Sequence, residues 1–268
     1  MNLGDMLKRD FNLALNIADG FGQTCDDPIM ILDSNAIDAS MTQMQVLKGL
    51  GMGRGILWRT IARNFLENGQ NSVEQIQIET KEVTKSQIIT QQESYYFDVS
   101  KASSNGKPLP EVIVLSDNQT KLDFPYELGW LHFSGSRDYE IEVAGAGKSI
   151  SYNALGIKAT IYLYDNLRSD IPADIDSSVV RNEFESAVSC LMVDHPAADR
   201  LGELSKTKSF ILQAFNYEGD FSILGLGVFR GNFIKLRITH AQDPLLINIS
   251  NQFIFAVEAN VMGNIIMH

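Results

Sequence analysis

The stretch "SFILQAFNYEGDFSILGLGVFRGNFIKLRITHA", residues 209–241, decides the fold of the second half of the chain. It contains three runs of apolar and β-branched residues, separated by short turns at Glu218–Asp220 and Gly231–Asn232. Strands joined by turns this short pair with each other in antiparallel fashion. The stretch therefore predicts three neighbouring strands of an antiparallel sheet.

Helices and further strands are predicted around these three strands. Apolar residues at spacings of three and four predict one helix over 176–193 and a last helix over 244–262. Shorter apolar or alternating runs predict additional strands at 111–115, 122–126, 129–134, 138–144 and 157–165. The second half is therefore expected to be an α+β domain in which helices pack on an antiparallel sheet.

The first half shows helical patterns early and strand patterns late. An amphipathic stripe predicts a helix over the first 21 residues, and a second helix over 37–47 is expected to end at the glycines that follow. After a short apolar run at 28–33, three long segments alternate polar and apolar residues: 56–68, 73–83 and 88–99. This pattern predicts an antiparallel meander in which one face of the sheet is exposed to solvent and the helices pack against the other face.

A linker is predicted between the two halves. The segment "SKASSNGKPLPE", residues 100–111, gathers serine, glycine and two prolines without a hydrophobic period. We place the domain boundary there, between a first α+β domain of residues 1–104 and a second of residues 105–268.

Two short patterns in the second half resemble those of PsbP-like domains. One is the apolar, proline-containing entry "LDFPYELGW" (122–130), and the other is the hairpin end "GNFIKLRIT" (231–239) before the last helix. The resemblance covers about residues 111–262 and implies a curved antiparallel sheet sandwiched with helices. It also implies a binding or assembly module, the role that most PsbP-like domains serve. These domains share no catalytic motif that could be carried over to this sequence.

Composition and charge exclude several classes of function. The chain of 268 residues has a net charge of −11, which argues against a nucleic-acid or anionic-membrane surface. It has no run of 18 apolar residues and no signal-peptide pattern at its start, so we expect no membrane insertion. A cytoplasmic location follows, or an extracytoplasmic one if a leader has been removed.

The stretch "IEVAGAGKSISYNALG" (141–156) contains Gly-Lys-Ser, the end of a phosphate-binding loop. Glu142 stands where the first glycine of such a loop is needed, and a carboxylate there would repel phosphate. A β-branched and aromatic segment follows Lys148 in place of the required helix. We therefore predict a turn between strands and no nucleotide.

A glycine-rich basic segment, "KGLGMGRGILWR" (48–59), is a candidate anion-binding site through Lys48, Arg54 and Arg59. Glycines let backbone N–H groups approach an anion. The predicted order of helix then strand is nevertheless the reverse of a dinucleotide-binding loop, and a helix C-terminus presents carbonyl groups. A helix-to-strand connection with a glycine cap is the alternative.

No catalytic residue, metal ligand or cofactor motif is found. The cysteines are Cys25 and Cys190, and Cys190 is expected to be a buried, inert thiol on a helix. The histidines stand alone, without a partner at metal-ligand spacing: His132, His195, His240 and His268.

Two groups of tyrosines are candidates for contact with a partner. Tyr95 and Tyr96 are adjacent in a strand, so their rings point to opposite faces of the sheet, whereas Tyr162 and Tyr164 share one face. Exposed tyrosines on a sheet suit protein recognition. Covering of these rings by a helix or by the other domain is the alternative.

The sequence does not determine a function. We expect a non-catalytic protein-binding or assembly module that acts through its sheet faces, with a protein partner or further copies of the chain. The alternative is an enzyme whose active-site residues are dispersed in the sequence and meet only in the fold.

Overall fold

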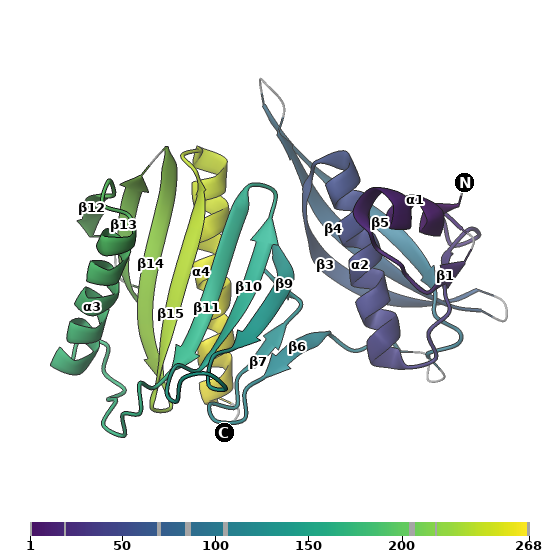
Figure 1. The fold of residues 1–268 in the computed structure, drawn as a ribbon. Helices are drawn as coiled ribbons and strands as arrows, with labels where there is room; N and C mark the ends of the chain where they lie inside the picture. The colour runs from purple at the N-terminus through teal and green to yellow at the C-terminus, as the bar shows by residue number, and fades with distance from the viewer. Residues whose placement is uncertain are drawn as a thin grey trace. The chain divides into compact units, whose positions relative to one another are not determined.

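The computed structural model describes residues 2–18, 20–68, 71–83, 87–103, 107–203, 207–217 and 219–266. The chain divides into two compact units, Met1–Ile113 and Val114–His268 (Figure 1). The boundary expected between residues 104 and 105 lies outside the described residues. The division between the units falls later, because the segment 107–111 is bonded to the first unit, as shown below.

The first unit has mixed α and β structure. Its elements in chain order are α1 (Leu3–Phe11), β1 (Ile17–Ala18), β2 (Ile29–Ile31), α2 (Ala36–Arg54), β3 (Leu57–Asn68), β4 (Asn71–Val83) and β5 (Ile88–Asp98). The strands form one sheet in the order β1-β2-β5-β4-β3. The meander β3-β4-β5 is antiparallel as predicted, but β2 pairs with β5 in parallel, with Ile29 opposite Phe97. The expectation of a wholly antiparallel sheet was therefore wrong, because β2 and β5 are not consecutive strands and can run in the same direction.

The opening helix is shorter than predicted. Helix α1 ends at Asn12, which takes a left-handed conformation (φ 56°) and bonds back to the carbonyls of Leu7 and Lys8. Asparagine tolerates this conformation better than most residues, so it stops the helix without a glycine. Beyond it, Ile17 and Ala18 form β1, and Phe21 is 59% exposed although it lies on the predicted stripe.

Helix α2 runs through the glycines at which it was expected to end. A Cβ atom on Gly49 would lie 2.5 Å from Leu7 Cδ2, and one on Gly51 would lie 2.6 Å from Trp58 Cδ1. The glycines therefore let α1 and β3 pack close to the backbone of α2. The helix ends one turn later at Gly55, which has a φ of 65° and caps it.

This explanation predicts an unusual effect of a helix-favouring substitution. Gly51→Ala is expected to lower the free energy of unfolding by about 1–2 kcal/mol, because the clash with buried Trp58 outweighs the helix propensity of alanine. Gly263→Ala, in the last helix, is the matched control. A Cβ there meets nothing within 4 Å, so this change should be neutral or stabilising in thermal unfolding. Equal effects of the two substitutions would contradict the close-packing explanation.

The second unit, which begins within β6, is also mixed α and β. Its elements are β6 (Ile113–Ser116), β7 (Asp123–Pro125), β8 (Glu127–Leu128), β9 (Leu131–Asp138), β10 (Lys148–Ala154), β11 (Ile157–Tyr164), α3 (Ser178–Asp194), β12 (Asp199–Glu203), β13 (Ile211–Tyr217), β14 (Asp220–Phe229), β15 (Asn232–Ala241) and α4 (Pro244–Ile266). An antiparallel sheet has the order β12-β13-β14-β15-β11-β10-β9-β8, and β6 pairs with β7 separately.

The stretch that decides the fold forms β13, β14 and β15 as predicted. Arg230 and Gly231 both have positive φ angles, 46° and 74°, which suit the tight turn between β14 and β15. In the turn before β14, Glu218 lies outside the described residues. The strand predicted over 138–144 was wrong: residues 139–147 form a loop, and the alternating Ile141 and Val143 are 84% and 61% exposed.

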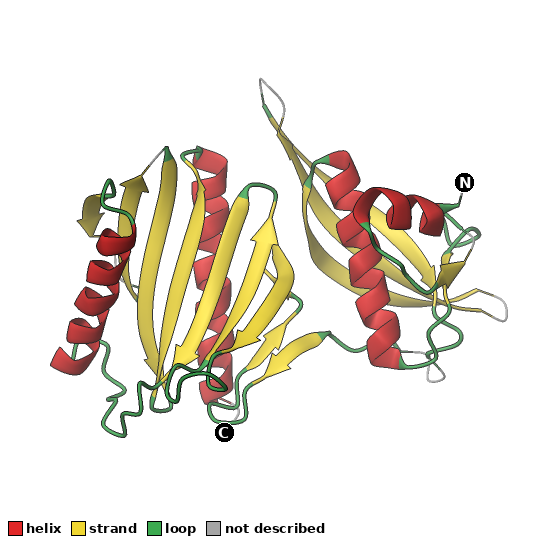
Figure 2. Ribbon diagram, in the orientation of Figure 1, coloured by secondary structure: helices red, strands yellow, loops and turns green. Residues whose placement is uncertain are grey.

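The two helices of the second unit cover opposite faces of the eight-stranded sheet (Figure 2). Helix α4 packs on the face of Tyr152, whose ring lies 5.7 Å from that of Phe253. Helix α3 packs over β13 and β14 on the other face, through a core that includes Val180, Phe184 and Leu226. Because α3 lies at the β12–β14 end of the sheet, it leaves a cavity beside β11 and β15.

Helix α4 is the one described helix whose length and composition would allow it to cross a membrane. The sequence shows no uninterrupted apolar run here, because polar residues such as Asn251 and Gln252 fall within it. In the fold, its residues Ile249, Phe253 and Val257 are fully buried.

Candidate functional site

The candidate site is a cavity of about 400 Å³ between α3 and the sheet of the second unit. Strands β11 and β15 form its floor, and α3 forms one wall. The residues that matter for its chemistry are Tyr162, Tyr164, Glu183, Cys190, Lys235 and Arg237. A concave site of this size with a few convergent polar groups is the usual form of a ligand site in proteins.

Strand alternation places the floor residues on one face. Lys235 pairs with Tyr162 across β11 and β15, and Arg237 pairs with Thr160 one step along. Since side chains two residues apart share a face, Lys235, Arg237, Tyr162 and Tyr164 all project on the side of α3. The structure therefore brings together two of the tyrosines predicted to bind a partner and two cations that were not among the predicted site residues.

Lys235 is the electrostatic centre of the cavity. Its Nζ lies 4.7 Å from the ring centroid of Tyr162 and 5.3 Å from that of Tyr164. Within the part of the chain that the structure describes, no carboxylate forms an ion pair with this ammonium. Burial lowers the pKa of Lys235, because the charged form loses hydration; the charge of Glu183 opposes this effect. The two aromatic faces compensate the buried charge only in part.

Glu183 on α3 is held by two donors. The hydroxyl of Tyr164 donates to its Oε1 at 2.7 Å, and Asn166 Nδ2 donates to its Oε2 at 3.3 Å. Burial raises the pKa of Tyr164, and the neighbouring Glu183 charge adds to this shift. Tyr164 therefore stays protonated and fixes the carboxylate of Glu183 at the wall of the cavity.

Cys190 differs from its prediction. It is exposed and lines the cavity, whereas a buried thiol was expected. The apolar stripe of α3 that faces the sheet contains Val188 and Leu191, and Cys190 lies beside this stripe. The sequence pattern predicted the helix correctly. It placed Cys190 on the buried stripe of the helix, whereas the residue lies next to that stripe and is exposed.

Tyr95 and Tyr96 in the first unit are not among the residues that line the cavity. Tyr95 is 5% exposed and lies beneath α2, where Arg54 donates to its hydroxyl at 3.3 Å. Tyr96 points to the opposite face and accepts a hydrogen bond from Gln75 Nε2 at 3.1 Å. Covering by a helix, the alternative weighed from the sequence, accounts for Tyr95.

The three cations of the glycine-rich segment do not converge. Arg54 forms an ion pair with Glu93 at 2.5 Å on the α2 side of the sheet, and this hydrogen-bonded pairing raises the pKa of Arg54. Arg59 pairs with Glu79 at 2.6 Å, and Glu79 alternates with Ile78 to the opposite face. Burial lowers the pKa of Lys48, which lies within α2. Both guanidinium groups already have carboxylate partners, which disfavours an anion site.

The loop that resembles the end of a phosphate-binding loop holds one of its own carboxylates. The N–H groups of Gly145 and Gly147 donate to the two carboxylate oxygens of Glu140, each at 2.8 Å. Lys148 begins β10 and pairs with Asp117 at 3.5 Å. The amides that would receive a phosphate are thus occupied by Glu140, and a strand follows the loop.

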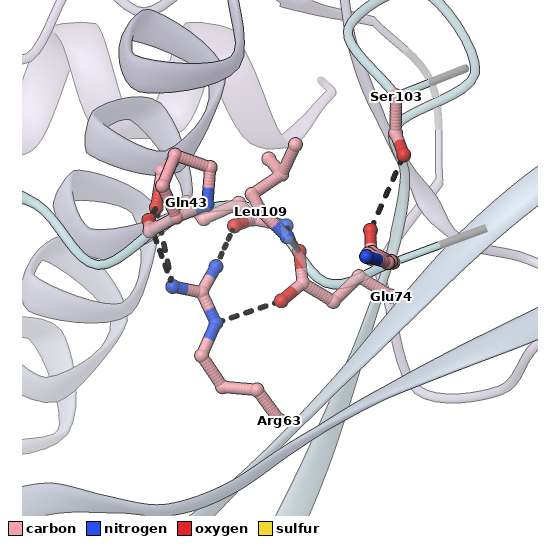
Figure 3. Close-up of polar contacts among 8 residues, drawn as sticks. Gln43, Arg63, Glu74, Ser103 and Leu109 are labelled. Carbon is pink, nitrogen blue, oxygen red and sulfur yellow. Dashed lines mark hydrogen bonds and ion pairs between the residues drawn. The ribbon is translucent and has the colours of Figure 1, made fainter. Parts of the chain in front are cut away.

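A buried polar network in the first unit binds the backbone of the segment 107–111 (Figure 3). Glu74 on β4 is fully buried and accepts hydrogen bonds from Arg63 Nε at 2.7 Å, Gln43 Nε2 at 3.1 Å and the Leu109 N–H at 3.3 Å. Arg63 Nη1 also donates to the Pro110 carbonyl at 3.4 Å. Hydrogen bonds from within the first unit thus compensate the buried charge of Glu74. The same network holds the segment 107–111 against this unit.

The histidines and cysteines form no metal site among the described residues. His132 is buried 3.7 Å from Glu127, and His240 Nδ1 lies 2.7 Å from the Ala241 carbonyl. His268 lies outside the described residues.

The comparisons with known proteins add no relative. No family model matches the chain, and neither the curated proteins nor the solved structures contain a match. The resemblance to PsbP-like domains stays a prediction from two short patterns, and the function is argued from the site alone.

Proposed function

We propose that the protein is a non-catalytic binding module and that the cavity beside α3 takes up a ligand with a carboxylate group. One observation supports this most strongly: the ammonium of Lys235 is largely buried over two tyrosine rings and has no carboxylate partner among the described residues. A buried charge without a counter-ion is costly to a fold. An anionic ligand would supply the missing partner.

The charges around the cavity favour a monoanion. Lys235 and Arg237 lie on the sheet floor of the cavity, and the carboxylates of Glu183 and Asp194 also line it. A dianionic phosphate would be repelled by these carboxylates, whereas one carboxylate can approach the two cations on the sheet floor. The guanidinium of Arg237 suits planar carboxylates, and the tyrosine rings provide apolar walls for the rest of a small ligand.

The proposal predicts a pH-dependent affinity for a simple probe, propionate. The carboxylate stabilises the charged form of Lys235. Propionate should therefore bind with its full affinity at pH values below the pKa that this lysine has in the free protein. This affinity should fall as pH rises through that lowered pKa, because the neutral amine attracts the anion less. Titration followed by NMR, at constant ionic strength from neutral to alkaline pH, measures this dependence.

Propionamide is the matched control, since it has the same shape without the charge. It should not shift the resonances of the residues that line the cavity. Equal binding of propionate and propionamide, or an affinity for propionate that rises with pH over this range, would contradict the proposal.

A protein partner is a second candidate, favoured by an exposed apolar cluster near the cavity. Ile141, Val143 and Leu167 are 84%, 61% and 73% exposed. Their loops are joined by a hydrogen bond from the Asn166 N–H to the Gly145 carbonyl at 2.9 Å, and Leu167 has an unfavourable φ of 58°. An exposed apolar surface of this kind suits a protein contact.

A second copy of the chain is the simplest partner to test. Light scattering is expected to give a mass above that of the monomer at high concentration. Replacement of Ile141, Val143 and Leu167 by serine should return it to the monomer mass. A monomeric mass of the unmodified protein at every concentration would contradict self-association.

A further inference from the structure

We propose that the side-chain amine of Lys235 reacts reversibly with the carbonyl carbon of an α-oxo acid and holds it in the cavity as an imine. This inference rests on the proposed carboxylate site and names its ligand class. The apolar, aromatic surroundings of Lys235 would then have a second effect, because they make its amine more nucleophilic.

The surroundings of Lys235 favour the neutral amine more than the surroundings of a lysine on the protein surface do. The Nζ of Lys235 lies over the rings of Tyr162 and Tyr164 and lines a cavity large enough for a small acid. Burial lowers the pKa of Lys235, so a larger share of it is unprotonated than of an exposed lysine. Lysines activated in this way are the ones that form imines with carbonyl compounds.

The titratable groups that face Lys235 come from every element around it. Tyr162 and Tyr164 lie on β11, Arg237 follows on β15, and α3 contributes Glu183, Cys190 and Asp194. Burial raises the pKa of both tyrosines, so they are neutral at physiological pH. Glu183 is the carboxylate at the wall that accepts hydrogen bonds from Tyr164 and Asn166.

The chemistry is a simple condensation. The ammonium of Lys235 first loses a proton to solvent, and its nitrogen lone pair then forms a bond to the carbonyl carbon. The carbonyl π pair moves to oxygen, which takes up a proton while the nitrogen gives one up, and a carbinolamine results. The hydroxyl then takes up a proton from solvent and leaves as water while the nitrogen lone pair forms the second carbon–nitrogen bond, which gives a protonated imine. No oxidant or reductant is consumed, and hydrolysis reverses the reaction.

Arg237 makes the site selective for α-oxo acids over simple aldehydes. It lies two residues from Lys235 on the same face of β15, and both line the cavity. A carboxylate directly attached to the carbonyl carbon would contact Arg237 while the carbonyl carbon approaches the amine. Positioning of this kind raises the effective concentration of the reacting group.

Reductive trapping tests the inference on the full chain. The protein is treated with glyoxylate and sodium cyanoborohydride, and the carboxymethylated lysines are located by peptide mass spectrometry. Lys235 is expected to be modified more than about tenfold faster than Lys158, an exposed lysine on the same sheet face. Propionate should slow modification of Lys235 and leave Lys158 unchanged.

The variant Arg237→Met separates recognition of the ligand carboxylate from the reactivity of the Lys235 amine. It should slow modification of Lys235 by glyoxylate more than modification by propanal, a neutral aldehyde. The propanal rate reports whether the variant keeps its cavity, and it also measures the effect of losing the Arg237 charge, which helps to lower the pKa of Lys235. If propionate binds but Lys235 is modified no faster than Lys158, the imine is excluded and the carboxylate site stands. If propionate does not bind either, both proposals fail.

Discussion

Replacement of Glu74 by alanine is expected to lower the free energy of unfolding of the first unit by about 3–5 kcal/mol, the usual effect of removing one member of a buried ion pair. The side chain of Glu74 is fully buried, and that of its partner Arg63 is only 18% exposed. The substitution leaves the guanidinium without its carboxylate, and the amide groups of Gln43 and Leu109 lose their acceptor. Denaturant unfolding of the full chain measures the change.

The matched control is Glu79→Ala on the same strand. Glu79 pairs with Arg59, whose side chain is 38% exposed, so the loss should stay within about 1 kcal/mol. Similar effects of the two substitutions would show that the buried network does not stabilise the first unit.

The same network changes the expectation for the predicted linker. Residues 107–111 belong to the network through the Leu109 N–H and the Pro110 carbonyl, which also accepts a hydrogen bond from Ser40 at 2.7 Å. A protease should therefore cut this segment slowly in the wild type and faster in Glu74→Ala. The sequence indicated a linker from its prolines and glycine, but it could not show that distant side chains hold the backbone.

Replacement of Lys235 by methionine is expected to make the protein more stable and at the same time to abolish propionate binding. Methionine has a similar length and no charge, so it removes the cost of burying an ammonium that forms no ion pair with a carboxylate among the described residues. We expect a gain of about 1 kcal/mol in the free energy of unfolding of the second unit. Loss of the charge should weaken propionate binding by more than about tenfold. A gain in stability with a loss of binding is typical of a residue retained for function.

Lys158→Met is the control for this pair of measurements. Lys158 is exposed on the same sheet face, so its replacement should change neither stability nor propionate binding appreciably. A less stable Lys235→Met protein with unchanged binding would instead assign Lys235 a purely structural role.

The fold was predicted best where one pattern decides one element. The three strands β13, β14 and β15 and the helix α3 follow from short turns and from an apolar stripe. The errors occurred where a tertiary contact overrides a local signal. Glycines that normally end a helix continue α2, because Leu7 and Trp58 need the space.

The site could be predicted only in part. The shared face of Tyr162 and Tyr164 follows from strand alternation. The cavity exists because α3 packs over β13 and β14 and not directly over β11 and β15, which no local pattern shows. A signal for Lys235 and Arg237 was present in "NFIKLRITH", where two cations alternate with buried apolar residues in a central strand. Cations at these positions project from one face, and such a face is usually covered or functional.

The pKa of Lys235 with and without propionate tests the central claim most directly. Lysine side chains are labelled with ¹³C at Cε, and the resonance of Lys235, assigned by its absence in Lys235→Met, is followed as a function of pH. The carboxylate site predicts a pKa below the usual lysine range in the free protein and a rise when propionate is added, with no change at Lys158. A pKa of Lys235 that propionate leaves unchanged would contradict the account.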